Sequence, residues 1–383
     1  MDYSFFQNYY CKLSIDDHPL IPKNISNCVI REWIFDILPR IEISILDDGY
    51  LTENFPILDN SILDIEVGVN PEDEHIFHAQ FEIINKVIDN IEGNKASLIT
   101  LSGILQTNDL YFTKTRSFKN MNSSQVISQI SNELKLKFNK NLNLNTSDMM
   151  TWLQINQSNF QFIKHIVERA YCSDDVIFCY ADIFGNLNYT SLKSEINKSY
   201  STKAIYSLEN FNKYEFTNKE DKKTIWYNSF NTANYTKHFN MNYGYGLTGN
   251  YYDSSKLNEI NVNKDYHPLT EISNKSYDKT VNVKTFPIFT NNVFADYFKA
   301  KLQNVYFKNI FNISTVLNIN SLSSVKLFDT IILMVNSLQR VELDEVQSGE
   351  YIVSGITHSF GNSSLYKKHI SIHRNGYNRS QSV

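Results

Sequence analysis

Two runs of β-branched and aromatic residues near the C-terminus place the strongest constraint on how this chain folds. The first run is Gly349–Phe360 and the second is Leu365–Gly376. Between them, Gly361–Ser364 supplies only glycine, asparagine and serine. Two strand-forming runs around so short a connection are typical of a β-hairpin. We therefore expect a long terminal hairpin within a β-rich fold.

Alternation along each strand of this hairpin predicts which side chains share a face. One face of the first strand is expected to carry Ile352, Ile356 and Phe360. On the second strand, the predicted faces are Tyr366, Ile370 and Ile372 on one side and Lys367, His369 and His373 on the other. One side of the hairpin is therefore expected to be apolar and buried.

Composition limits the class of protein. A length of 383 residues indicates two or three domains, and 42% hydrophobic residues are enough for packed cores. The formal net charge is −5, and the lysines and arginines are spread along the chain without a cluster. Sequence-specific nucleic-acid binding is disfavoured, because it needs a basic patch or stripe.

The cysteines and the N-terminus predict the compartment. Cys11, Cys28, Cys172 and Cys179 form no Cys-x-x-Cys pair. The first residues lack the basic and apolar segments of a secretory signal, and no window holds the roughly 18 apolar residues of a membrane span. These features predict a soluble protein with free thiols, made in a reducing cytoplasm without membrane contact.

The first third of the chain alternates as a sheet does. Ile41, Ile43 and Ile45 are expected on one face of a strand that ends at the turn signal Asp47-Asp48-Gly49. Three further strands are predicted at Ile62–Val69, Ile76–Ile84 and Leu98–Leu105. Regular turns and no convincing helix favour a small barrel or sandwich here.

The centre of the chain changes to a helical period. Apolar residues at helical spacing follow Ser123, with Asn122 or Ser123 as the expected N-cap. A second helix is predicted from about Ser158. Next, Val176–Tyr180 and Leu187–Tyr189 are expected to pair as strands across Phe184–Asn186. The central block is therefore predicted to be α+β.

The rest of the chain is predicted less evenly. Residues 205–230 are expected to return to strands, whereas 231–285 show little periodicity and are interpreted as an excursion of long loops. A third helix is predicted at Asn291–Phe307, followed by strands near Asn309–Ile319 and Val325–Val335. The polar tail Tyr377–Val383 is expected to be loose.

One glycine-rich segment imitates a cofactor motif. Gly244–Gly249 spells G-x-G-x-x-G. A dinucleotide site needs an apolar strand before this motif and a helix after it, and the flanking residues predict neither. We interpret the segment as a glycine-punctuated loop and expect no cofactor.

Metal binding is also disfavoured. His369 and His373 would chelate zinc on a helix, but their neighbours favour a strand, where they lie about 13 Å apart. His75 and His78 are expected on opposite faces of a strand. We therefore expect no metal site.

Two features suggest other functions. The acidic pairs Asp73-Glu74 and Asp174-Asp175 lie beside turn signals, and sequence adjacency does not create the facing carboxylates of a glycosidase. The tyrosine-rich segment 240–252 is suited to a sugar- or protein-binding platform, or to ordinary packing in an oligomer contact. We find no catalytic constellation.

Four blocks, in order along most of the chain, resemble the baseplate central hub (tail hub) proteins of T-even-type contractile-tailed bacteriophages. They are Lys114–Phe118 with the helix after it; Trp152–Ser158 with Tyr180–Leu187; the 291–307 helix with Lys326–Ile332; and the terminal hairpin with Ile356–Phe360. At the third block, many relatives carry Pro-Gly-Asp, whereas this chain has Phe328-Asp329. Residues 231–285 match nothing in the family.

The resemblance implies a β-rich α+β fold, with two tail-tube-like β-barrel domains and an inserted α+β domain. The first barrel is assigned to 1–115, the inserted domain to 116–203 and 231–289, the second barrel to 204–230 and 290–376, and the flexible tail to 377–383. The signature positions that carry over are Arg116, Phe118, Asp329, Ile356, Thr357, His358, Phe360 and Tyr366.

The resemblance also implies a structural role in the virion, without enzymatic activity or cofactor. Three copies would join the six-fold tail tube to a three-fold spike, with genome DNA passing through without specific binding. Expected partners are further copies of the chain, the spike, the tube or tube-initiator protein and the baseplate wedge proteins. Assembly is expected in the host cytoplasm, and Arg379 in the tail is expected to contact the spike.

Two alternatives remain open from the sequence. One is a carbohydrate- or receptor-binding tail protein, which would expose the aromatic residues of 240–252. The other is a tail-associated cell-wall hydrolase, which would need two carboxylates facing each other across a cleft.

Overall fold

The computed structural model describes most of the first half of the chain and the strands of the second. The described residues are 10–47, 51, 57–58, 60–68, 75–91, 96–142, 146–172, 175–198, 203–207, 225–234, 246–253, 258–265, 283–286, 300, 311, 313–319, 325–337, 344, 347–361 and 366–374. The predicted helix 291–307, apart from Ala300, and the tail with Arg379 lie outside them. None of the helices within these residues is long and apolar enough to cross a membrane.

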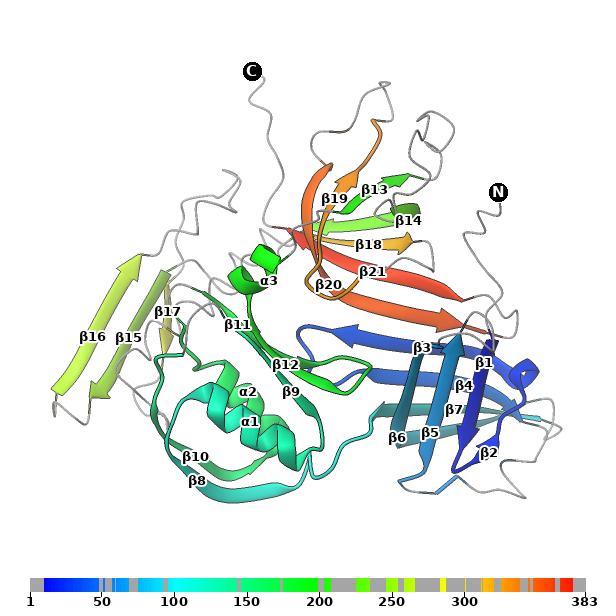
Figure 1. Ribbon diagram of the computed structural model, residues 1–383, viewed down its shortest axis with the longest axis horizontal. Helices are drawn as coiled ribbons and strands as arrows, with labels where there is room; N and C mark the ends of the chain where they lie inside the picture. Colours follow the sequence, from blue (N-terminus) through cyan, green and yellow to red (C-terminus); the bar gives the residue numbers. More distant parts are fainter. Residues whose placement is uncertain are drawn as a thin grey trace.

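Thirteen strands form one continuous sheet, in the order β19-β13-β14-β18-β21-β20-β3-β4-β7-β6-β5-β1-β2 (Figure 1). The strands of its first half are β1 (Tyr10–Ile15), β2 (His18–Pro19), β3 (Ile25–Trp33), β4 (Arg40–Asp47), β5 (Ile62–Gly68), β6 (His75–Ile91) and β7 (Ala96–Leu105). The short helix η1 (Pro22–Asn24) connects β2 to β3. The second half of the sheet consists of β13 (Lys203–Ser207), β14 (Ile225–Asn234), β18 (Ile313–Ile319), β19 (Thr330–Met334), β20 (Gly349–Phe360) and β21 (Lys367–Arg374).

The strands predicted in the first third are present. Ile41, Ile43 and Ile45 are buried on one face of β4 while Glu42 is exposed, as the alternation predicts. β6 is longer than predicted. It pairs with β5 only up to Glu82, while its pairing with β7 continues to Ile91.

The second half closes on itself. β19 pairs with β20 on one side and with β13 on the other. Together with the pairings β13–β14, β14–β18, β18–β21 and β20–β21, this closes a ring of six strands.

The terminal hairpin exists, but one predicted face is wrong. A bulge at Ser354 lies between the pairs Val353–Ile372 and Gly355–Ser371. It shifts the alternation by one residue, so Ile352 lies on the opposite face from Ile356. Ile356 packs inside the six-strand ring, whereas Ile352 packs with Phe328 and Ile34 in a separate cluster.

The hairpin also joins the two halves. Beyond the bulge, Gly355–Phe360 of β20 pairs antiparallel with Cys28–Trp33 of β3. Figure 1 shows the hairpin lying directly beside the strands of the first half. The first strand of the terminal hairpin, β20, therefore completes the edge of the first half.

The central block is α+β, as predicted. It comprises β8 (Thr113–Met121), α1 (Ser123–Glu133), β9 (Lys137–Asn141), β10 (Met150–Ser158), α2 (Asn159–Val167), β11 (Ile177–Ala181), β12 (Asn186–Ser191) and α3 (Leu192–Lys198). Asn122 and Ser158 cap α1 and α2, each in a reciprocal capping box with a glutamine at the third helical position. β11 and β12 form the predicted pair, and β9 extends it in parallel.

The interpretation of 231–285 as long loops is wrong for its described parts. β14 continues to Asn234, and β15 (Gly246–Asp253), β16 (Asn258–Asp265) and β17 (Val283–Phe286) form a three-stranded sheet. The glycine-rich segment enters β15 instead of forming a loop. Cross-strand pairing decides strand formation here, and an Asn- and Lys-rich composition gives little local signal for it.

The two halves of the large sheet repeat one another. The orders β3-β4-β7-β6-β5 and β14-β18-β21-β20-β19 correspond, with every neighbouring pair antiparallel. Bulges occur at the same places: Ser26 and Asn228 in the first strands, and Ile84 and Ser354 in the hairpins. One alignment therefore relates both halves residue by residue.

The turn that precedes β5 and β19 repeats as well. The Leu58 N–H donates to Ser61 Oγ at 3.0 Å, and the Lys326 N–H donates to Asp329 Oδ2 at 2.9 Å. Asn60 and Phe328 occupy the same position in the two turns, and both have φ of 66°. The predicted β-rich character of the fold is confirmed by the thirteen-stranded sheet.

Candidate functional site

A buried polar chain connects β3, β20 and Tyr366 at the junction of the two halves. The Nε2 of His358 lies 3.2 Å from Glu32 Oε1, and its Nδ1 is hydrogen-bonded to the Tyr366 hydroxyl. All three side chains are buried. We refer to Glu32, His358 and Tyr366 as the junction triad.

The central block meets the same triad. The Ile183 N–H donates to the second oxygen of Glu32, Oε2, at 2.7 Å. Nearby, the Ala181 N–H donates to the Ile37 carbonyl at 2.7 Å. Glu32 therefore hydrogen-bonds both the terminal hairpin and the central block, so that one side chain links three parts of the chain.

The protonation of the triad follows from its partners. Burial lowers the pKa of His358, and Lys368 acts in the same direction, against the opposing effect of Glu32. The imidazole is therefore neutral at pH 7. The neutral ring donates its Nε2–H to Glu32 Oε1, which leaves Nδ1 to accept the Tyr366 O–H.

An apolar cluster surrounds this junction and draws on the same three parts. Ile34 comes from the first half, Phe328 and Ile352 from the second, and the central block contributes Val176, Phe178, Tyr180 and Leu192. The Phe328 ring lies 4.8 Å from that of Phe178 in an edge-on arrangement and 5.6 Å from that of Tyr180. Packing of this kind fixes the relative positions of the three parts.

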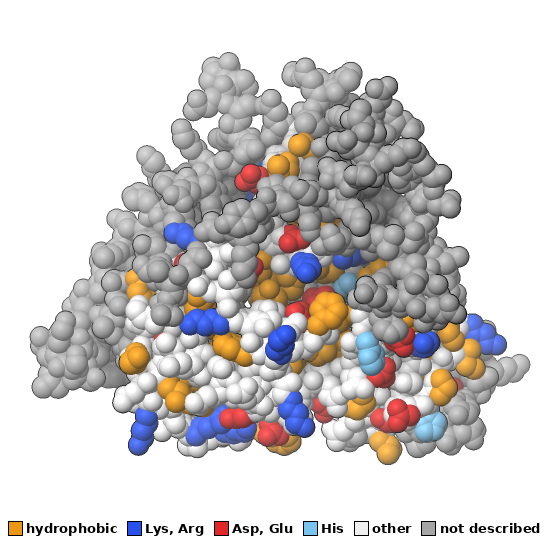
Figure 2. Space-filling model, in the orientation of Figure 1, with side chains coloured by type: hydrophobic (Ala, Val, Ile, Leu, Met, Phe, Trp, Pro, Cys, Tyr) orange, Lys and Arg blue, Asp and Glu red, His pale blue; other side chains and the backbone are white. Residues whose placement is uncertain are grey.

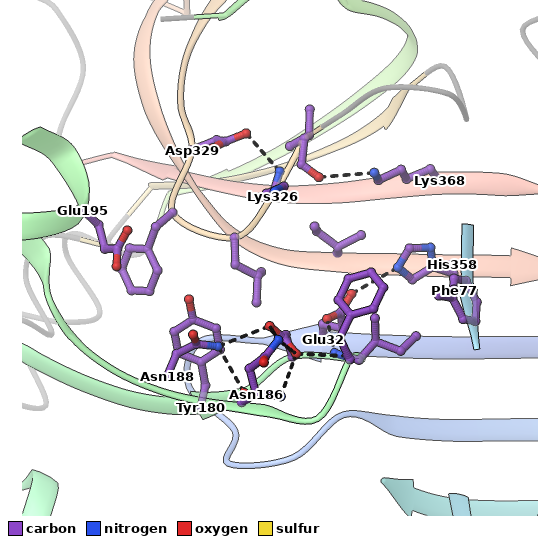
Figure 3. Close-up of a pocket in the computed structure, with 17 residues that line it drawn as sticks. Glu32, Phe77, Tyr180, Asn186, Asn188, Glu195, Lys326, Asp329, His358 and Lys368 are labelled. Carbon is purple, nitrogen blue, oxygen red and sulfur yellow. Dashed lines mark hydrogen bonds and ion pairs between the residues drawn. The ribbon is translucent and has the colours of Figure 1, made fainter. Parts of the chain in front are cut away.

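A cavity of about 700 Å³ opens beside the triad. Figure 3 shows Asn186, Asn188 and Tyr180 on one side of it and Lys326 and Asp329 on the other, with His358 and Phe77 at one end. In Figure 2, hydrophobic and charged side chains gather together near the centre of this face. Tyr366 does not line the cavity, so its hydroxyl is not presented to a substrate there.

The structure brings together some of the predicted signature positions. Ile356, His358 and Asp329 line the cavity, and Tyr366 bonds His358. Phe360 and Thr357 lie on β20 opposite Cys28 and Arg31 of β3.

Arg116 and Phe118 lie apart from this site, in the central block. Arg116 donates to Gln154 Oε1 at 2.8 Å, to Asn159 Oδ1 at 3.0 Å and to Glu133. Its guanidinium lies 4.8 Å from the ring of Phe118. The fork of Arg116 thus joins β8, β10, α1 and α2, which is a structural role.

Sequence reasoning missed Glu32 and Ile183. No local pattern singles out Glu32, because its partner His358 lies 326 positions away. Only the alternation of β3 offers a signal, since it places a carboxylate among buried residues.

The described residues contain no group of three or more histidine, cysteine, aspartate or glutamate side chains placed to hold a metal. His369 and His373 lie on β21, a strand, as predicted. Asp175 caps the start of β11 through the Val176 N–H, whereas Asp73, Glu74 and Asp174 lie outside the described residues.

Acid is expected to destabilise the protein between about pH 6.5 and pH 4. Burial lowers the pKa of His373, which packs against Phe35 and Phe311, to about 4. A histidine with a lowered pKa binds its proton more readily in the unfolded chain. The contribution of His373 to stability is therefore complete when the pH is above the histidine pKa of the unfolded chain, about 6.5. It falls by roughly 3 kcal/mol as the pH drops toward 4.

Urea unfolding of the wild type and His373→Phe at pH 7.5, 6 and 5 tests this expectation. The phenylalanine keeps a ring between Phe35 and Phe311 and removes the titration. The difference in unfolding free energy between the two proteins should shift toward the variant as the pH falls. Parallel pH profiles would show that His373 is already protonated, or already exposed, in the folded protein.

Comparisons with known proteins agree on a fold. Neither a protein-family model nor a curated protein matches the sequence. A tail protein from Neisseria meningitidis MC58 is similar in structure, with a TM-score of 0.62 at 8% identity over 96% of this chain and 97% of that one. A 43 kDa tail protein of prophage MuSo2 from Shewanella oneidensis has a TM-score of 0.59 at 12% identity, over 97% and 100%.

A third similar structure belongs to a secretion system. The Escherichia coli c3393 protein, a type VI secretion component with structural similarity to the T4 tail proteins gp27 and gp5, has a TM-score of 0.51 at 11% identity, over 96% of this chain and 79% of that one. At these identities the likeness concerns the fold alone. The chain has the fold of these tail proteins along nearly its whole length.

Proposed function

We propose that the protein is a structural tail protein of a bacteriophage, and that three copies form the central hub of the baseplate. The observation that carries the proposal is the likeness to two tail proteins over at least 96% of this chain and at least 97% of theirs. Likeness of that extent involves the whole architecture, whereas one common domain would account for only part of it.

The repeated halves support the hub role in particular. A hub must fit a six-fold tube on one side and a three-fold spike on the other. A trimer whose chains each contribute two equivalent β-domains presents both symmetries. In this proposal the first domain is 1–115, the second is 204–230 with 290–376, and the central block with the 231–289 excursion is inserted between them.

The surface chemistry of the large sheet suits a channel for DNA. On the face opposite the core, half-buried serine and threonine side chains recur between the exposed charges of Arg31, Arg40, Glu42 and Lys367; they are Ser44, Thr100, Ser102, Thr357 and Ser359. Small neutral hydroxyls neither attract phosphate, as lysine or arginine clusters do, nor repel it. DNA would pass such a surface without being held.

The proposed partners follow from this position. They are the spike, which Arg379 would contact, the tube or tube-initiator protein and the surrounding wedge proteins, all within the virion baseplate. The role requires no cofactor and no catalysis. The junction triad and the apolar cluster around it would keep the two domains in a fixed relative orientation.

Mass photometry of the purified protein, alone and with its neighbouring tail proteins, tests the proposal. We expect particles of about three times the 44.6 kDa chain mass, formed by the protein alone or only with the spike. A protein that stays monomeric under both conditions and binds glycans would instead support a receptor-binding role.

A further inference from the structure

We propose that neighbouring copies are joined by β-sheet pairing between the distal half of β6 in one copy and the distal half of β14 in the next. This inference rests on the proposed trimer and specifies how its chains meet. It assigns the contact a defined antiparallel register, with Val87 opposite Ala233. The same junction already exists once within each chain, between β20 and β3.

The junction within the chain shows how such a contact is built. Before its bulge at Ser354, β20 pairs with β19; after the bulge, the same edge of β20 pairs with β3. The bulge therefore marks the point where one neighbouring strand ends and the next begins. Bulges commonly redirect strands in this way.

β6 repeats the first part of this arrangement without the second. Before its bulge at Ile84, β6 pairs with β5, as β20 pairs with β19. After the bulge, no strand within the described residues pairs with that edge of β6. The matching of bulges makes residues 86–90 of β6 equivalent to 356–360 of β20.

β14 supplies the complementary edge. Matching the bulges at Ser26 and Asn228 makes residues 230–234 equivalent to 28–32 of β3. β13 pairs with β14 only as far as Tyr227. Beyond it, in the part of the chain that the structure describes, that edge of β14 pairs with no strand. Among the described residues, two strand edges thus lack a partner where the repeat predicts a junction.

Apolar side chains on β6 and β14 are exposed in the single chain, as expected if a neighbouring copy covers these two edges. Ile84, Val87 and Ile88 on β6 are 56%, 44% and 44% exposed, and Phe230 on β14 is 38% exposed. Open apolar strand edges invite pairing with another chain, and soluble proteins usually block them with charges or bulges. The edge carries the bulge at Ile84 and an exposed Asp89, whereas the amine of Lys86 is held by the Ile57 carbonyl at 2.7 Å.

The repeat also fixes the register. Within the chain, Ile356 lies opposite Glu32, Thr357 opposite Arg31 and His358 opposite Ile30. The equivalent contacts between copies are Lys86 with Asn234, Val87 with Ala233, and Ile88 with Thr232. The Ile34 N–H donates to the Ser354 carbonyl at 3.0 Å, so Ser354 and Ile34 form a hydrogen-bonded pair. Hydrogen-bonded and non-hydrogen-bonded pairs alternate along antiparallel strands, which makes Thr357 and Arg31 a pair without direct hydrogen bonds.

The alternation between hydrogen-bonded and non-hydrogen-bonded pairs decides which pair is best placed to form a disulfide. Residues of a non-hydrogen-bonded antiparallel pair have Cα atoms about 4.5 Å apart, within the range that a disulfide spans. Val87 and Ala233 form the equivalent pair between copies. We therefore expect Val87→Cys with Ala233→Cys in one chain to form covalent trimers under mild oxidation, visible on a non-reducing gel.

The native cysteines do not compete. Cys28, Cys172 and Cys179 are buried, and burial raises the pKa of Cys11 to about 12, so that little thiolate is present near neutral pH. Each single substitution is a control and should give no trimer. The pair Ile88→Cys with Ala233→Cys should link about tenfold less, because successive side chains on a strand point to opposite faces.

A second variant tests the edge without a new thiol. The Ile88 N–H is expected to point toward the neighbouring copy, so Ile88→Pro removes an intermolecular hydrogen bond while the ladder to β7 remains. Trimers should be lost, and circular dichroism should remain that of the wild type. Val87→Pro, whose N–H faces β7, should instead destabilise the monomer.

The outcomes separate this inference from the proposed function. A wild-type trimer whose Val87–Ala233 pair fails to link would overturn the register and leave the trimer intact. A protein that is monomeric alone and with its neighbours, and that does not link, would overturn both. Links that form equally well in the shifted pair would also contradict the register.

Discussion

Replacing Phe328 with glycine is expected to destabilise the protein less than replacing it with alanine, the reverse of the usual order. Phe328 has φ of 66°, in the left-handed region where a bulky residue is rare. Its ring is nevertheless buried in the cluster shared by the three parts of the chain. The residue therefore combines an unfavourable backbone with a favourable side chain.

The two contributions can be separated by substitution. Removing a buried phenylalanine ring costs about 3–5 kcal/mol in unfolding free energy, whichever small residue replaces it. Alanine keeps the left-handed backbone penalty, whereas glycine relieves about 1 kcal/mol of it. Phe328→Ala should therefore be about 1 kcal/mol less stable than Phe328→Gly, with both far below the wild type.

Urea unfolding of both variants measures the difference, and the first half provides a matched control. Asn60 holds the equivalent position with the same φ and an exposed side chain. Asn60→Gly should leave stability nearly unchanged, and Asn60→Ala should cost about 1 kcal/mol. If Phe328→Ala proved the more stable of its pair, the turn would have a different backbone conformation in solution.

Removing the carboxylate of the junction triad should have an effect of comparable size. Glu32→Ala leaves the Ile183 N–H and the His358 Nε2–H buried without an acceptor. Each unsatisfied donor costs about 1–3 kcal/mol, so we expect a loss of about 3–5 kcal/mol. Glu32→Gln should lose much less, because its amide oxygen accepts the Ile183 N–H while its amide NH2 donates to the Nε2 of a His358 that has shifted its proton to Nδ1.

Chemical unfolding at pH 7.5 compares these two variants with Glu42→Ala. Glu42 is exposed on the neighbouring strand, so its replacement should change stability by less than about 0.5 kcal/mol. Equal losses for the alanine and glutamine variants would mean that the charge, and not the hydrogen bonds, holds the junction together.

Sequence patterns predicted those elements whose signals are local. The two helices predicted in the central block, α1 and α2, begin at the expected residues, since Asn122 and Ser158 each carry a capping box that can be read within four residues. Alternation likewise located β4, β5 and β7. The same reasoning misplaced Ile352, because a bulge changes the alternation and leaves no mark of its own in the sequence.

The candidate site was only half predictable. His358 and Tyr366 followed from the resemblance of the terminal hairpin, but Glu32 depends on a contact between distant strands. The repeat of the two halves was expected from the resemblance alone, because the equivalent residues differ chemically. Asn60 and Phe328 share a backbone conformation and little else, and Ile41 corresponds to Thr315. Geometry is shared between the halves where residue identity is not.

The pairing of β20 with β3 has a consequence for synthesis. The edge of β3 is complete only when residues near Phe360 have left the ribosome, more than 300 residues after β3 itself. At about 5–20 residues per second, that edge waits roughly 15–65 s for its partner. Throughout that interval a nascent chain exposes an unpaired strand, a known route to aggregation. The edge of β3 is therefore protected from aggregation only once β20 has been made and has paired with it.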